Sequence, residues 1–131
     1  MIVALLREET VMRYLMFIKH TEDYRNHQVP AGLYEAMGEF VQEGFKSGVF
    51  IDTNGLKPTA DAHRVQLRGR KITVTDGPFT ETKEVIGGYA VMELKSEAEA
   101  LKYARKFMEI HLQHWPEFEG ECEVRPVQDQ P

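Results

Sequence analysis

Four ionisable side chains occur within nine residues of this chain, in a stretch that also contains glycine and proline. The stretch reads Asp76-Gly77-Pro78-Phe79-Thr80-Glu81-Thr82-Lys83-Glu84, and Val85-Ile86-Gly87-Gly88-Tyr89 follows directly. Glycine and proline at fixed places indicate a shaped loop rather than the interior of a helix or strand. Because binding and catalytic residues concentrate on such loops, residues 76–84 are the first candidate site.

Asp76 is the first candidate for a catalytic role. A carboxylate held at the end of a strand could act as a general base or polarise a neighbouring histidine. The alternative is structural, because aspartate also caps turns through its own backbone, and the sequence favours neither role. Gly77 has a structural reason as well, since proline restricts the residue before it.

The charged residues further along the loop are candidates for substrate binding. Glu81 and Lys83 would share a face if the segment is extended, and could then bind an anionic substrate or form a structural pair. Solvated surface charge is the commoner fate of such side chains. Of the cations elsewhere, Arg64 and Arg125 are expected to contact the acidic loop or a substrate carboxylate, with Arg125 preferred. Tyr89, just after the loop, completes the binding candidates.

Two histidines are further catalytic candidates. His111 follows the apolar stripe of a predicted helix, so it faces the interior, either as a hydrogen-bonded core residue or as a group that titrates in a cleft. His20 follows a predicted buried strand, with acidic residues just after it. His111 and His114 could share a metal, but two ligands fall short of the three that catalytic zinc normally has. We therefore expect no metal.

Composition limits the classes of function. The length of 131 residues predicts one domain, with residues 1–11 as a loosely ordered extension before residues 12–131. The net charge of -5 and the lack of a basic cluster argue against nucleic-acid binding. The opening apolar run is too short for a membrane span, and the single cysteine fits a cytoplasmic protein. No cofactor fingerprint is present, so none is expected.

The hydrophobic pattern predicts two helices packed on one sheet. Strands are expected at residues 14–18, 49–52, 89–92 and 121–127, a hairpin over residues 65–75, and helices over residues 33–45 and 96–115. Ser96 and Glu99 form a capping-box pattern at the start of the second helix. This order predicts an α+β, ferredoxin-like domain with a mixed sheet and an inserted β-hairpin. Both helices would cover one face, leaving an apolar face that we expect a second copy to cover.

The segment 76–84 also resembles the motif of the DGPF-domain proteins, a branch of the YCII-related family. Three further stretches carry the resemblance: Gly55-Leu56-Lys57-Pro58, Val74-Thr75 before the motif, and Glu123-Val124-Arg125-Pro126-Val127. The resemblance implies a dimeric α/β barrel built from ferredoxin-like subunits. It also implies a His–Asp pair in the cleft, but Ala31-Gly32-Leu33-Tyr34-Glu35, where that histidine is expected, contains none.

Two functions therefore remain open from the sequence. One is an acid/base enzyme that transfers a proton or eliminates a group on a small polar or aromatic metabolite, using Asp76 with His111 or His20. The other is a non-catalytic dimeric module that binds a ligand or regulates a partner. A displaced histidine or carboxylate pKa inside a pocket would favour the enzyme.

Overall fold

The structure is a computed structural model that describes residues 11–23 and 28–128. The predicted extension at residues 1–11 lies outside the described residues except for Val11. The strands are β1 (Met12–His20), β2 (Phe50–Gly55), β3 (His63–Arg68), β4 (Lys71–Asp76), β5 (Val85–Leu94) and β6 (Glu121–Pro126). The helices are α2 (Ala31–Lys46), α3 (Glu97–His114) and the short 3₁₀ helix η2 (Thr59–Asp61). No helix in these described stretches combines the length and the apolar character needed to cross a membrane.

Both long helices begin and end for local reasons. The Ser96 side chain accepts a hydrogen bond from the Glu99 backbone N–H at 3.2 Å, which confirms the predicted N-cap of α3. Pro30 precedes α2, and the chain leaves that helix through Gly48, whose φ of 84° favours glycine. In α2 the side chains of Leu33 and Phe40 are buried, as the apolar stripe predicted.

Strands β1, β2, β5 and β6 form one sheet in the order β2-β5-β1-β6. Every adjacent pair is antiparallel, so the expectation of a mixed sheet was wrong. Strands β1 and β2 do run in the same direction, but β5 lies between them. The order and the two crossover helices give the ferredoxin-like α+β fold that the sequence predicted.

A β-bulge interrupts the pairing of β1 with β5. Ile18 pairs with Gly88 and Lys19 with Ile86, so Gly87 is the extra residue on β5. A bulge of this kind bends the strand and re-aims the side chains beside it. The bulge lies beside His20, the last residue of β1.

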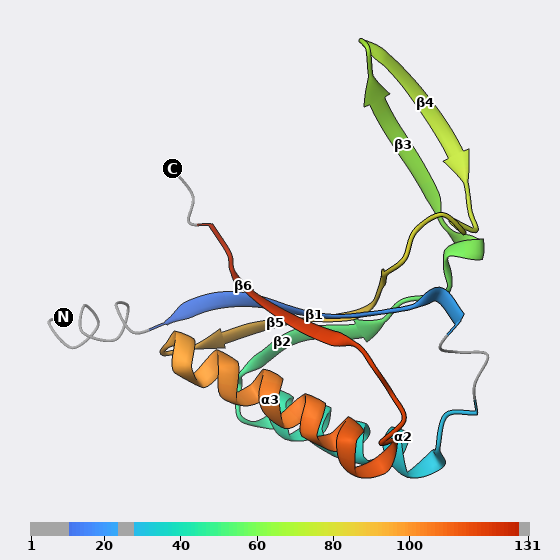
Figure 1. The fold of residues 1–131 in the computed structure, drawn as a ribbon. Helices are drawn as coiled ribbons and strands as arrows, with labels where there is room; N and C mark the ends of the chain where they lie inside the picture. Colours follow the sequence, from blue (N-terminus) through green and yellow to red (C-terminus); the bar gives the residue numbers. More distant parts are fainter. Residues whose placement is uncertain (1–10, 24–27, 129–131) are drawn as a thin grey trace, which may run out of the picture.

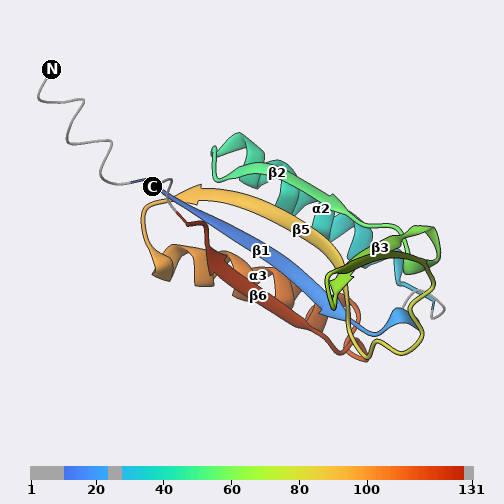
Figure 2. The same cartoon turned by 90° about the horizontal axis from the view of Figure 1, so that it is seen from above.

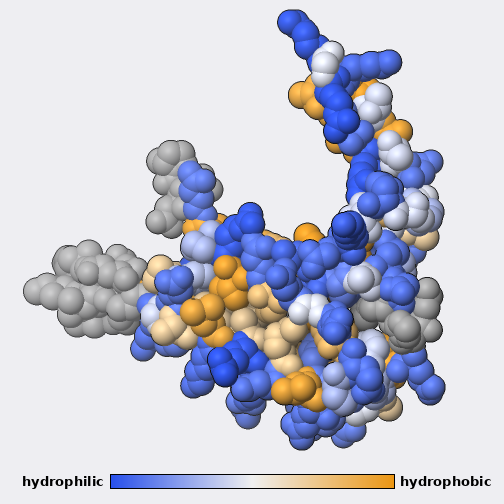
Figure 3. Space-filling view, in the orientation of Figure 1, coloured by the Kyte–Doolittle hydropathy of each residue, from blue (hydrophilic) through white to orange (hydrophobic). Residues whose placement is uncertain are grey.

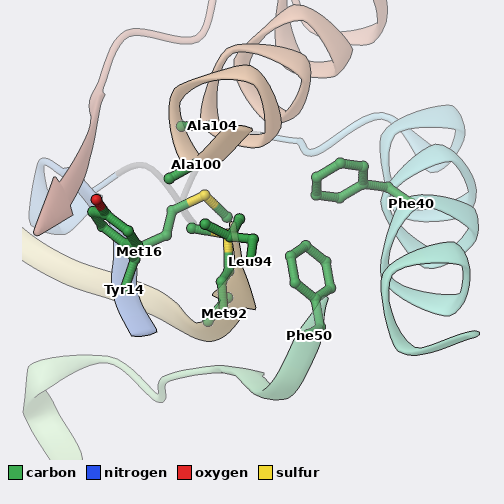
Figure 4. Close-up of a cluster of buried hydrophobic side chains, with 9 residues drawn as sticks. Tyr14, Met16, Phe40, Phe50, Met92, Leu94, Ala100 and Ala104 are labelled. Atoms are coloured by element: carbon green, nitrogen blue, oxygen red, sulfur yellow. The ribbon is translucent and has the colours of Figure 1, made fainter. Parts of the chain in front are cut away.

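The hydrophobic core lies between the helices and one face of the sheet (Figures 1 and 2). Met92, at 0% exposure, is at its centre, and Tyr14, Met16, Phe40 and Phe50 surround it (Figure 4). Because side chains alternate along a strand, the neighbours of these residues point to the opposite face. We call that face the open face. Its central apolar side chains are half-buried rather than buried: Leu15, Phe17, Tyr89 and Val91.

Strands β3 and β4 form a separate two-stranded sheet, confirming the predicted hairpin. We call residues 63–76 the arm. Figure 1 shows that the arm rises from one end of the four-stranded sheet, on the side away from the helices. The arm therefore stands beside the open face.

Candidate functional site

A cavity of about 300 Å³ lies between the two helices and the sheet. Volumes of this order are at the small end of known ligand pockets. Its walls come from β1, β2, β5, both long helices and the segment after α3. Aromatic and aliphatic side chains make up most of the lining, including Phe40, Phe50, Phe107 and Phe118. The cavity is therefore shaped for a small ligand with substantial apolar surface.

His20 lies in this cavity at 5% exposure. Its Nδ1 is 2.8 Å from the carbonyl oxygen of Thr21. A carbonyl only accepts hydrogen bonds, so Nδ1 carries the proton and Nε2 is the basic nitrogen of the neutral ring. A Cβ on Gly87 would lie 1.9 Å from this Nε2, so the bulge residue must be glycine for the ring to fit.

His111 enters the same cavity from α3 and is 6% exposed. Its Nδ1 donates to the Phe107 carbonyl one turn earlier, at 3.0 Å, which again leaves Nε2 as the basic nitrogen. Burial lowers the pKa of His111 below its ordinary value, only partly offset by that hydrogen bond. His111 is therefore a neutral imidazole near pH 7.

Phe118 connects the two histidines. Its ring centroid is 4.8 Å from that of His111 and 6.5 Å from that of His20. The two histidines are 91 positions apart in the sequence, yet the fold places both against one aromatic ring. The interior position predicted for His111 is thus observed, and His20 shares its cavity.

The remaining lining is polar at only a few points. Thr53 donates through its hydroxyl to the Tyr89 carbonyl at 2.7 Å, and the Tyr89 hydroxyl donates to Asp52 Oδ2 at 2.8 Å. Tyr89, a predicted binding residue, borders the cavity, but its side chain and the hydrogen bond to Asp52 lie on the open face. None of the described lining residues is an aspartate, glutamate, lysine or arginine. The histidines are therefore the groups in the described lining that can exchange a proton near neutral pH.

The 76–84 loop lies at the base of the arm rather than in the cavity wall. Phe79 is buried at 6% exposure, and the Arg64 guanidinium stacks 3.8 Å from its ring centroid. The Phe79 backbone N–H donates to Thr59 Oγ1 at 3.2 Å. The Glu22 carboxylate accepts from the Thr59 backbone N–H at 3.1 Å and from its hydroxyl. These contacts attach the loop, η2 and the end of β1 to one another.

Gly77 fits this base tightly. Its backbone N–H donates to the Ala62 carbonyl at 2.8 Å, and a Cβ at this position would lie 1.7 Å from the Thr59 carbonyl oxygen. No side chain can occupy that space without moving backbone. The glycine of the motif therefore has a structural requirement that is independent of any chemistry.

The structure separates Asp76 from the two cavity histidines. Asp76 is the last residue of β4, and its carboxylate is 2.7 Å from Nδ1 of His63, its cross-strand partner in the arm. Both side chains are largely exposed. Asp76 is not among the cavity-lining residues, so the pairing expected with His20 or His111 is replaced by a pairing with His63.

The predicted charged binding residues lie outside the cavity lining too. Glu81 pairs with Arg64, and a backbone hydrogen bond and that guanidinium lower the pKa of its carboxyl group. Lys83 is exposed in the same loop. Arg125, preferred as the loop's partner, instead pairs with Glu123 on its own strand; Arg64 makes the contact.

Several cavity residues were not singled out from the sequence. Met37 and the more exposed Tyr34 line the cavity from α2, and Phe118 does so from the segment after α3. The helical spacing of Tyr34 and Met37 is a signal that the sequence contains. Phe118 lies in a segment without periodicity, so its place beside both histidines could not be inferred.

Comparison with known proteins identifies the family. Residues 12–119 match the YCII-related domain, so most of the chain is covered and the protein belongs to the YCII-related family. The expected resemblance is thereby confirmed at the level of the family. A search among curated proteins found no match. Within the described part of the chain, no three histidine, cysteine, aspartate or glutamate residues come together as a metal site would require.

Proposed function

We propose that the cavity binds a small, ring-containing metabolite and that its histidines transfer a proton to or from it. The observation that carries this proposal is the placement of two buried histidines from β1 and α3 in one apolar cavity. Each has Nδ1 fixed by a backbone carbonyl, so each neutral ring has Nε2 as its proton acceptor. Fixing the tautomer in this way prepares a histidine for general base chemistry.

The ligand chemistry follows from the lining. Aromatic walls favour a flat or hydrophobic body, and the histidine nitrogens favour one hydroxyl or carbonyl group on it. Proton transfer at an atom next to the ligand's hydroxyl or carbonyl group, or an elimination that begins with this transfer, needs only an acid or a base from the protein. Burial lowers the pKa of His111 and keeps its ring unprotonated near neutral pH, so we assign His111 as the proton acceptor and His20 as its proton-transfer partner.

The second candidate function is a non-catalytic ligand-binding module. It is favoured by the absence of a carboxylate from the described lining, because a general-acid histidine is often oriented by one. The two candidates share the same cavity and differ in whether the bound ligand exchanges a proton.

One experiment separates these candidates. Small aromatic compounds bearing a hydroxyl or carbonyl group are screened by NMR chemical-shift perturbation, and each binder is then incubated with the protein in D₂O. Solvent deuterium at a carbon atom of the ligand, incorporated about 10²–10⁴-fold more slowly in His111→Gln, supports the enzyme. Binding without exchange supports the binding module. Shifts confined to residues outside the cavity would falsify both candidates.

Asp76→Asn and His63→Gln are the matched controls. Both alter a histidine–carboxylate pair, but this pair lies on the arm and not in the cavity lining. If either control abolishes exchange as fully as His111→Gln, the site is at the arm base and the cavity assignment is wrong.

We also propose that the protein works as a homodimer joined through the open face. Leu15 lies opposite Val91, and Phe17 lies opposite Tyr89, so four apolar side chains form a continuous patch. Ion pairs such as Arg13–Glu93 and Lys19–Glu123 flank the patch. An apolar centre with a charged rim is the pattern of a protein interface. Light scattering coupled to size-exclusion chromatography is expected to give twice the 15.1 kDa chain mass.

A further inference from the structure

The arm has an apolar face that the described chain does not cover. Val65 lies opposite Val74, and Leu67 lies opposite Ile72, so the four side chains lie on one face of the hairpin. Their exposures are 69%, 66%, 74% and 67%. Figure 3 shows hydrophobic surface along the arm between hydrophilic atoms. Four exposed aliphatic side chains on one side of a two-stranded ribbon are a surface that a partner covers.

A hairpin of two strands is only marginally stable by itself in water. The base of this arm is nevertheless fixed, by the stacking of Arg64 on buried Phe79 and by the close approach of Gly77 to Thr59. The arm is therefore held in a defined direction, beside the open face and away from the helices (Figures 1 and 2). A fixed direction suits a recognition element better than a loose flap.

Charge distinguishes the arm from the rest of the chain. The arm has four cationic residues and one acidic residue, a net charge of +3: Arg64, Arg68, Arg70, Lys71 and Asp76. The whole chain is at -5, so the remainder is at -8. The basic arm of one copy is therefore attracted to the acidic body of a second copy. The arm of the second copy is attracted to the body of the first in the same way.

We propose that the arm binds a second copy of this chain, with its apolar face against the partner's body. This rests on the homodimer proposed above and adds a second, arm-mediated contact to it. A two-fold axis would make the contact twice, because each copy has one arm and one acidic body. The exposed tips of the arms, with Arg68, Arg70 and Lys71, then meet the partner's acidic surface.

The test is the self-association of arm variants. Leu67→Thr with Ile72→Thr replaces one cross-strand pair of the apolar face by two β-branched threonines, so the hairpin retains its strand propensity. The control, Gln66→Thr with Thr73→Val, changes the neighbouring cross-strand pair on the other face. Sedimentation equilibrium over a concentration series is expected to show the dimer Kd raised at least about tenfold in the first variant. The control is expected to stay within about threefold of the wild type, since its side chains lie outside the contact.

Cross-linking gives an independent readout of the same contact. In a mixture of light and isotope-labelled heavy protein, a carbodiimide is expected to join Lys71 of one copy to a carboxylate outside residues 63–76 of the other. Cross-links from Lys71 that stay within one chain overturn the proposal.

Each of the remaining outcomes would overturn the proposed arm-mediated contact. If the dimer Kd is unchanged in the variant with Leu67→Thr and Ile72→Thr, the open-face dimer stands and the arm-mediated contact is refuted. A wild-type protein that is monomeric at every concentration overturns both, while the ligand assay of the cavity is unaffected. If self-association is unchanged but the variant loses affinity for a short DNA duplex, the arm serves nucleic acid and the proposal is wrong.

Discussion

The same substitution at two glycines of α2 is expected to give two proteins of clearly different stability. Gly38 is exposed, and a Cβ there would meet no atom within 4 Å. Gly38→Ala therefore adds helix propensity alone, a stabilisation of about 1 kcal/mol. At Gly44 a Cβ would lie 2.2 Å from Cδ2 of Phe50, so the same change drives an atom into a buried ring.

The Phe50 ring has little room to move away. It packs edge-on against Phe40 at a centroid distance of 5.3 Å and contacts Tyr103 at 5.9 Å. Overpacking a well-packed site of this kind costs about 1–3 kcal/mol. Both variants gain the same propensity, so the difference in their free energies of unfolding isolates the packing term. We expect Gly44→Ala to be less stable than Gly38→Ala by about 1–3 kcal/mol.

Equilibrium unfolding in urea measures this difference. The m-values of the two variants should agree, because neither changes the surface exposed on unfolding. If Gly44→Ala is as stable as Gly38→Ala, Phe50 does not pack against α2. The cavity wall that Phe50 forms would then be wrongly placed as well.

Three further measurements test the base of the arm, the cavity and the cysteine. Gly77→Ala, whose Cβ would overlap the Thr59 carbonyl, is expected to lose about 1–3 kcal/mol of stability and to increase amide exchange in the arm; unchanged exchange would contradict the tight fit. Burial lowers the folded-state pKa of His111 below 6.5, so the unfolded chain binds its proton first as the pH falls. The stability that this residue contributes is thus present above pH 6.5 and declines as the pH falls below it, so His111→Gln should flatten the stability profile of the wild type in this range; an unchanged profile would contradict the burial of His111. Burial raises the pKa of Cys122 to about 11, so iodoacetamide at pH 8 should alkylate the folded protein about 100-fold more slowly than the unfolded one; equal rates would show an accessible thiol.

Much of the fold could be predicted because the patterns are local. The N-cap at Ser96 and the alternation through β3 and β4 depend on neighbours in sequence, and both are observed. The sheet's pairing could not be obtained in this way. The sequence shows that β1 and β2 are joined by a helix and run in the same direction, but it does not show that β5 inserts between them and makes each pair antiparallel.

The site shows the same limit. His111 could be placed inside because its helix periodicity is visible, whereas its meeting with His20 depends on tertiary packing around Phe118. The pairing of Asp76 with His63 follows from the register of the arm, which the sequence alone does not define. Arg125 was preferred over Arg64 on the basis of its motif, but the alternation of side chains along β6 places it on the same face as Glu123, with which it pairs instead.

The extra residue at Gly87 makes the length of β5 a constraint of its own. Beyond the bulge, Val85 lies opposite His20 and Ile86 lies opposite Lys19, so the odd and even positions exchange faces at this point. A substitution at Gly87 disturbs only the space around His20, but a deletion would restore unbroken alternation. Ile86, 48% exposed, would keep its place opposite Lys19, but the bend that the bulge gives β5 beside His20 would be lost. Homologous chains that differ in length by one residue here would therefore present a different cavity, even with every other residue unchanged.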